Sequence, residues 1–126
     1  MKPLRWSISI VAAIIVVGSG WFGVKHYRCK QRNEAFARRI ESIKQDAREQ
    51  LKIGTKKADV ARFFYAHGIP FELAGSEAIG TLITTGGCAP LGCGTDRALI
   101  DVRMRIDTDG TTTDEPVVMA MYVDCL

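Results

Sequence analysis

The sequence has few of the residues on which most catalytic and metal sites depend. Its 126 residues include only two His and four Cys, which lie too far apart for the ligand spacing of a zinc finger. It also lacks a Gly-rich phosphate loop, a dinucleotide-binding fingerprint and a nucleophile elbow. We therefore predict no catalytic residue, no metal site and no cofactor.

The chain is too short for two full domains and has no strong excess of charge of one sign. A charged fraction of 25%, a hydrophobic fraction of 47% and a net charge of +3 lie near the averages for soluble proteins. These values argue against a disordered chain, a collagen-like chain and a membrane protein with several spans. One small domain with an appendage remains.

The appendage is an uncharged apolar stretch near the N-terminus. Residues 7–24 contain no charged side chain, and as a helix they would extend about 27 Å, close to the thickness of the hydrocarbon layer. Trp6 precedes the stretch, and Trp21 and Tyr27 lie at its other end, as aromatic anchors at membrane interfaces do. We predict a basic tail at residues 1–6 and a transmembrane signal anchor at residues 7–24.

A cleaved signal peptide is the alternative interpretation of the same stretch. Lys2 and Arg5 would form its basic start, and the small residues 18–20 would form its cleavage site. Trp21 and Phe22 continue the apolar stretch beyond that site, which favours a retained anchor.

The orientation of the anchor depends on two signals that disagree. Several basic residues follow the stretch and, by the positive-inside rule, would place the C-terminal part in the cytoplasm. A short basic start before an apolar stretch and the presence of four Cys favour the opposite orientation. We predict a single-pass protein of the bacterial inner membrane with a periplasmic C-terminal domain. The membrane-proximal basic residues are Lys25, Arg28, Lys30, Arg32, Arg38 and Arg39.

Residues 25–52 are predicted to form an amphipathic helical stalk. Its apolar positions recur at helical spacing at Phe36, Ile40, Ile43, Ala47 and Leu51. This stripe packs either on the chain's own domain, which we favour, or on a second copy as a coiled coil. A pair of small residues in the span, Ser19 and Gly23, adds a weak signal for a homodimer.

Residues 53–126 are predicted to form a small α+β domain. After Gly54, Thr55 is placed to cap a second, short helix that ends at Gly68. Beyond Pro70 the apolar pattern has a period of two, which predicts an antiparallel sheet of three or four strands, with the helices covering its apolar face. The strand signals are Phe71 to Leu73, Ile79 to Thr85, Ile100 to Ile106 and Val117 to Val123, where the odd-numbered residues Val117, Met119, Met121 and Val123 carry the apolar pattern.

Charge divides along the chain and indicates which partners fit. Residues 25–62 contain 12 basic and 5 acidic residues, a net of +7, whereas residues 63–126 contain 3 basic and 9 acidic residues, a net of −6. The basic segment adjoins the predicted span, so membrane lipid is an expected partner. Its basic residues alternate with acidic ones and lack stacking aromatics, so we predict no nucleic-acid binding.

The cysteines suggest an oxidising compartment. Cys88 and Cys93 flank a segment with Gly and Pro that turns tightly, and we predict a disulfide between them. Cys125 is either a buried thiol or an alternative partner, and Cys29 is an unmodified thiol, a palmitoylation site or a bridge between two copies. A redox pair formed by Cys88 and Cys93 is an alternative, although their spacing and surroundings do not favour a lowered thiol pKa.

Residues 53–60 read IGTKKADV, and Phe63, Gly68, Ile69 and Pro70 follow. This pattern resembles the helix-opening signature of small bacterial envelope proteins of the SmpA/OmlA and β-lactamase-inhibitor-protein-like class. The resemblance covers roughly residues 53–123 and implies a helix pair on a short antiparallel sheet that serves as a binding or assembly module. The chain departs from that class by its anchor, which stands in place of a lipidated Cys, and by the Cys88 to Cys93 loop.

Together these features predict a membrane-anchored, non-enzymatic protein whose extracytoplasmic domain binds another envelope protein. Two alternatives stay open from the sequence. One is a membrane-tethered thiol redox protein, and the other is a cytoplasmic regulatory domain that is held on anionic lipid by its basic stalk.

Overall fold

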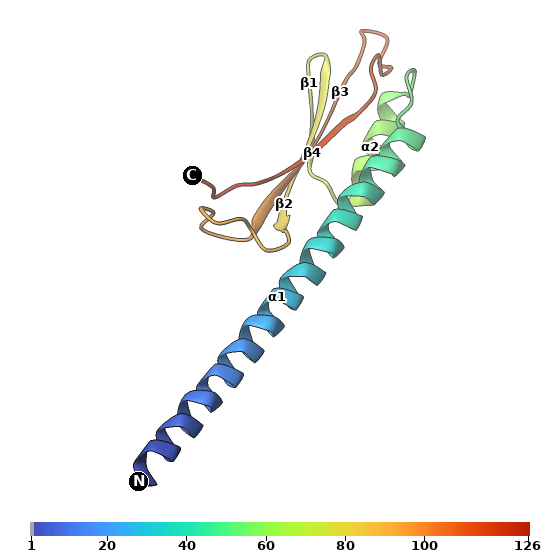
Figure 1. Ribbon diagram of the computed structural model, residues 1–126. Coiled ribbons are helices and arrows are strands. Elements are labelled where there is room, and N and C mark those ends of the chain that lie inside the picture. The colour runs from blue at the N-terminus through green and yellow to red at the C-terminus, as the bar shows by residue number, and fades with distance from the viewer. Residues whose placement is uncertain (1) are drawn as a thin grey trace.

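The computed structural model describes residues 2–126, with side chains from residue 6 onward. The chain forms one long helix, one short helix and one antiparallel sheet, as Figure 1 shows. The predicted α+β class is confirmed, and the sheet has four strands in the order β1-β2-β3-β4. The elements are α1 (Lys2–Gln50), α2 (Lys57–His67), β1 (Phe71–Ala74), β2 (Glu77–Thr85), β3 (Arg97–Arg105) and β4 (Val117–Tyr122).

Helix α1 joins the predicted span and the predicted stalk without a break. Its 49 residues correspond to a length of about 74 Å. Near its N-terminus it is long and apolar enough to cross a membrane, and none of that apolar window is buried in the protein. The N-terminal half of α1 projects away from the sheet (Figure 1), so its apolar side chains have no cover within the described residues.

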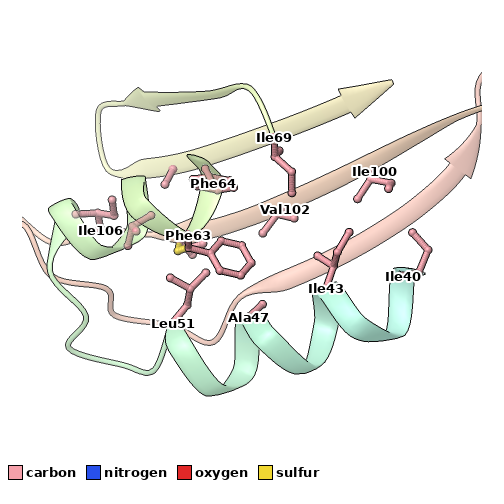
Figure 2. Packing of buried hydrophobic residues seen from close by; sticks show 13 residues of the cluster. Ile40, Ile43, Ala47, Leu51, Phe63, Phe64, Ile69, Ile100, Val102 and Ile106 are labelled. Carbon is pink, nitrogen blue, oxygen red and sulfur yellow. The ribbon is translucent and has the colours of Figure 1, made fainter. Parts of the chain in front are cut away.

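The C-terminal half of α1 belongs to the hydrophobic core. Ile43, Ala47 and Leu51 are buried against α2 and the sheet, and Figure 2 shows their side chains between the helices and the strands. Burial of one such aliphatic side chain stabilises the fold by about 1.5–3 kcal/mol. Of the two partners that the sequence left open for the apolar stripe, the structure therefore shows the chain's own domain. The folded unit begins within the segment that the sequence assigned to the stalk.

Helix α2 begins and ends by different means. Lys56 is its N-cap and makes no side-chain capping hydrogen bond, while the Thr55 hydroxyl donates to the carbonyl oxygen of Lys52. The prediction that Thr55 caps α2 is therefore wrong. Gly68 does end the helix, with φ of 63°, in the left-handed conformation that glycine adopts without strain. His67 precedes it.

The face that α2 turns to the sheet requires a close approach. A Cβ atom added to Gly80 of β2 would overlap the Phe64 ring, so only glycine allows this ring to lie directly on the strand. On the other side of the helix pair, His67 Nε2 lies 3.3 Å from Asp46 Oδ2 of α1. These contacts hold α1, α2 and the sheet together as one layered unit.

The covered and uncovered faces of the sheet follow from the strand register. On β3, Ile100 and Val102 face the helices, as the sequence predicts. Ala120 of β4 lies opposite Ile100, and Val118 lies opposite Val102. Directly opposed residues share a face, so the odd-numbered residues 117–121 face away from the helices. The prediction that these residues repeat the buried pattern of β3 is therefore wrong, because β4 is apolar on both faces and its alternation has no clear phase.

The two ends of the sheet are unlike. The β1–β2 and β3–β4 turns lie at the end near α2, whereas the β2–β3 loop and the C-terminus lie at the end that faces the N-terminal half of α1 (Figure 1). The second end is therefore the part of the domain nearest to the apolar stretch of α1.

Candidate functional site: the tethered loop and the open sheet face

Residues 86–96, here called the tethered loop, connect β2 to β3 and are held by two disulfides. Cys88 is bonded to Cys29 of α1, with 5.3 Å between their Cα atoms. Cys93 is bonded to Cys125, with 3.9 Å between their Cα atoms. The loop is thus fixed on one side to the long helix and on the other side to the segment after β4.

The predicted Cys88–Cys93 disulfide is therefore wrong. The paired residues are separated by 59 and 32 positions in the sequence, and bonds across such long loops remove more entropy from the unfolded chain than a short loop disulfide does. Local sequence patterns do not indicate how α1 is placed along the sheet, so they do not show that Cys29 lies beside the loop. Cys29 is bonded to Cys88 and Cys125 is bonded to Cys93, so neither is a free thiol, and the interpretation of Cys29 as an unmodified thiol is wrong.

Polar contacts reinforce the first disulfide. The backbone N–H of Cys88 donates to Asn33 Oδ1 at 2.8 Å, and Arg32 Nη2 lies 3.0 Å from Asp96 Oδ2. A Cβ atom added to Gly87 would overlap the Asn33 side chain, so the loop backbone lies directly against α1. Helix and loop therefore contact each other over about one turn of α1, from Cys29 to Asn33.

Asp96 organises the interior of the tethered loop. Its Oδ1 accepts a hydrogen bond from the backbone N–H of Ala89 at 2.8 Å, while its Oδ2 faces the Arg32 guanidinium. The Ala89 hydrogen bond, together with the hydrogen bond and charge of Arg32, lowers the pKa of the Asp96 carboxyl from its ordinary value, against a smaller opposing effect of desolvation. The carboxylate form is thus the one that holds the loop in place.

The predicted interfacial aromatics lie along the exposed part of α1. Trp6, Trp21 and Tyr27 are all largely exposed, and the Tyr27 hydroxyl accepts a hydrogen bond from Gln31 Nε2 at 2.9 Å. Their exposure leaves these rings available to a membrane interface, which is the role that the sequence predicts for them.

The six membrane-proximal basic residues divide into two groups. Arg32 pairs with Asp96, Arg38 lies 4.0 Å from a Glu34 carboxylate oxygen, and Arg39 donates to the Thr84 hydroxyl at 3.1 Å. These three residues contribute to the folded domain. Lys25, Arg28 and Lys30 make no ion pair within residues 6–126 and precede the domain on α1.

The second candidate site is the uncovered face of the sheet, here called the open sheet face. It comprises Ile79, Thr81 and Ile83 of β2, Leu99, Asp101 and Arg103 of β3, and Val117, Met119 and Met121 of β4. The exposed fractions of Ile83, Val117, Met119 and Met121 are 53%, 54%, 42% and 49%. No element within the described residues covers these side chains, so the face presents apolar area to the surroundings.

An ion pair with a buried carboxylate and an exposed guanidinium lies at the centre of the open sheet face. Asp101 is only 2% exposed, although it points away from the helices. Arg103 Nε donates to Asp101 Oδ2 at 2.6 Å, and the Thr81 hydroxyl donates to Asp101 Oδ1 at 3.3 Å. A buried carboxylate needs such partners. Arg103 and Thr81 hold Asp101 in place between the apolar residues of the face.

The cysteines and the acidic side chains of both sites are already engaged within the protein. All four cysteines are oxidised in disulfides, so none provides the thiolate that redox exchange or zinc ligation requires. Across residues that the structure describes, no three His, Cys, Asp or Glu side chains gather in a way that would hold a metal ion. Both sites offer rigid surfaces with apolar and charged parts.

Sequence reasoning missed several residues of these sites. The even number of cysteines was a usable signal for two disulfides, but the role of Asn33 required knowledge of where α1 meets the loop. Asp101 stands at a polar position of an alternating strand, where the pattern alone predicts a side chain that faces solvent. Its burial depends on Thr81 and Arg103, and Thr81 comes from another strand.

We expect peptide mapping under non-reducing conditions to give one peptide pair that links Cys29 to Cys88 and another that links Cys93 to Cys125. The double variant Cys29→Ser/Cys88→Ser should lower the free energy of unfolding by about 4 kcal/mol, because the chain-entropy cost of closing the long loop returns. Urea unfolding of the full chain in detergent measures this change. A peptide that links Cys88 to Cys93 would contradict the pairing.

The lowered pKa of Asp96 predicts a pH-dependent effect of Asp96→Asn. Because the folded state favours the carboxylate, the contribution of Asp96 to stability is present above its unfolded pKa of about 3.9 and is lost as the pH falls through the folded value. The variant should therefore melt at a lower temperature than the parent at neutral pH, and this difference should shrink on acidification. Asp109→Asn, in the β3–β4 turn, serves as the control, and a difference independent of pH would contradict the assignment.

Comparison of the chain with protein families, with curated proteins and with solved structures finds no match. The resemblance to the SmpA/OmlA and β-lactamase-inhibitor-protein-like class therefore stays a prediction. Function must be argued from the geometry of the tethered loop and the open sheet face.

Proposed function

We propose that the chain is a single-pass membrane protein whose extracytoplasmic domain binds another protein through the open sheet face. In this proposal residues 7–24 cross the bacterial inner membrane, and the domain lies in the periplasm. The function is a binding or assembly role in the cell envelope.

The disulfides support the extracytoplasmic location. Two disulfides that join distant parts of a chain are typical of oxidising compartments and rare in the cytoplasm. Three of the six basic residues that the positive-inside rule counts engage groups of the protein itself, namely Arg32, Arg38 and Arg39. Their number alone is therefore a weaker guide to orientation than it is in an unstructured loop.

The observation that carries the binding function is the apolar character of the open sheet face. The opposite face of the same sheet is covered by α1 and α2, whereas Ile83, Met119 and Met121 are about half exposed. Exposed apolar patches on small domains are typical of protein interaction sites. Methionine side chains are flexible and polarisable, which suits an adaptable contact surface.

The ion pair within the face supports a protein partner. Asp101 is already satisfied by Arg103 and Thr81, so a partner can cover it without leaving a charge unpaired. Arg103 keeps a side chain that is 55% exposed, and it remains able to form a further hydrogen bond at the rim of an interface.

The redox pair and the stalk homodimer that the sequence left open receive less support. A redox pair of Cys88 and Cys93 does not fit, because each residue is bonded to a different partner. The apolar stripe of the stalk is not available for a homodimer, because Ile40, Ile43 and Ala47 are buried in the chain's own core. Ser19 and Gly23 in the span leave a homodimer within the membrane as a possible arrangement.

The proposed orientation predicts the behaviour of reporters fused after Leu126. Alkaline phosphatase, which folds only in an oxidising compartment, should be active in that fusion, while green fluorescent protein exported in unfolded form should not fluoresce. Both activities are measured in intact cells. A fluorescent fusion with an inactive phosphatase would instead support the cytoplasmic regulatory domain on anionic lipid.

Binding through the open sheet face predicts a position-dependent crosslink. A photo-crosslinking amino acid in place of Met119 should give a discrete adduct with another protein in cells, and introduction of Ile83→Lys should abolish that adduct, because a charge would be buried in the interface. Adducts are identified by mass spectrometry after purification under denaturing conditions.

The control places the same crosslinker at Glu49, on the exposed side of α1, where no discrete adduct is expected. Near-ultraviolet circular dichroism of each variant checks that the domain remains folded. Equal adducts from both positions would contradict a specific site, and an adduct with a second copy of the chain would replace the proposed heterologous partner by a homodimer.

A further inference from the structure

A cavity of about 730 Å³ lies between α1 and the tethered loop. It is formed where the apolar part of α1 ends and where the loop is bonded to the helix through Cys29 and Cys88. The lining side chains from α1 are Trp21, Val24, Lys25, Arg28, Cys29 and Arg32, and those from the loop are Cys88, Ala89, Leu91 and Asp96.

The cavity changes from apolar to basic along α1. Trp21 and Val24 form an apolar wall, and Lys25 and Arg28 follow one turn further along the helix. Arg32, the third cation that lines the cavity, is already paired with Asp96, whereas Lys25 and Arg28 have no ion pair within residues 6–126. Two cations therefore remain available beside an apolar wall.

This order matches the order of groups in a phospholipid. If the apolar stretch of residues 7–24 fills the hydrocarbon layer, Arg28 lies about 6 Å beyond Val24 along the helix axis. A headgroup layer is about 5–8 Å thick on each side of the membrane. The two cations are thus at the depth of lipid phosphates, and Trp21 lies about one turn deeper, near the membrane interface where tryptophan is enriched.

The tip of the tethered loop supports the same placement. Leu91 and Leu126 are fully exposed, and the backbone N–H of Leu126 donates to the Gly92 carbonyl oxygen at 3.2 Å, so the two residues belong to neighbouring segments. Leu91 shares the cavity with Trp21, which brings an uncovered apolar side chain to the apolar end of the pocket. The Cys29–Cys88 disulfide and the Arg32–Asp96 pair hold the tip in this position.

We propose that this cavity is a phospholipid site, in which Lys25 and Arg28 bind the phosphate while Trp21 and Leu91 contact the acyl chains. The occupant is a lipid of the membrane that α1 enters, and the inference rests on the proposed membrane anchoring. The tethered loop then forms a second contact between the domain and the membrane surface.

The experiment uses the full chain in vesicles of phosphatidylcholine and phosphatidylglycerol. A photo-crosslinking amino acid replaces Leu91 and, in separate preparations, Ile14 in the apolar stretch or Asp109 in the β3–β4 turn at the far end of the sheet. Lipid adducts, measured by mass spectrometry, are expected from positions 91 and 14 and not from position 109.

A matched pair of variants tests the phosphate contact. Arg28→Gln, combined with the crosslinker at position 91, should reduce the adduct with phosphatidylglycerol about fivefold, which corresponds to the loss of one cation near an anionic surface. Lys30 lies two residues after Arg28, and its side chain does not line the cavity. Lys30→Gln removes the same charge and should leave the adduct nearly unchanged.

The outcomes separate this inference from the proposed anchoring. Adducts from position 14 without adducts from position 91 would overturn the lipid site and leave the anchor in place. No adduct from position 14 would overturn the anchor and the lipid site together. An adduct from position 91 that Arg28→Gln and Lys30→Gln reduce equally would overturn the assignment of the phosphate to this cavity.

Discussion

The packing of the C-terminal half of α1 on the sheet determines the arrangement of everything else in the molecule. Ile43 and Ala47 of α1, together with Leu51 just beyond its end, supply one wall of the core that covers the apolar face of β3. Because the same unbroken helix also carries the apolar stretch, the core fixes the position of the domain relative to that stretch. The same packing places Cys29 of α1 beside Cys88 of the tethered loop.

The sequence predicted those parts of the fold that depend on local periodicity. The helical spacing from Phe36 to Leu51 and the alternation from Ile100 to Ile106 each identified the residues that the core buries. The end of α2 at Gly68 was likewise predictable, because a glycine that adopts a positive φ at a helix end is a local signal. The α+β class follows from these elements, because two apolar helix faces and one apolar sheet face cover one another.

The remaining features depend on contacts between segments that are distant in the sequence. The phase of β4 could not be read, because Val117 to Tyr122 is apolar at nearly every position, and only its pairing with β3 shows which residues face outward. The disulfide partners of Cys29 and Cys125 depend on how the helix and the C-terminus approach one loop. The open sheet face and the tethered loop are therefore properties of the assembled fold, and local patterns alone did not reveal them.

Because α1 has no break, its apolar stretch and the folded domain turn together. An α-helix turns by about 100° for each residue, and α1 contains no flexible joint between the apolar stretch and Ile40 of the core. Rotation of the helix about its own axis within a membrane would sweep the open sheet face around by the same angle. The face that the domain presents to a neighbouring protein would thus depend on the rotational position of the apolar segment in such a membrane.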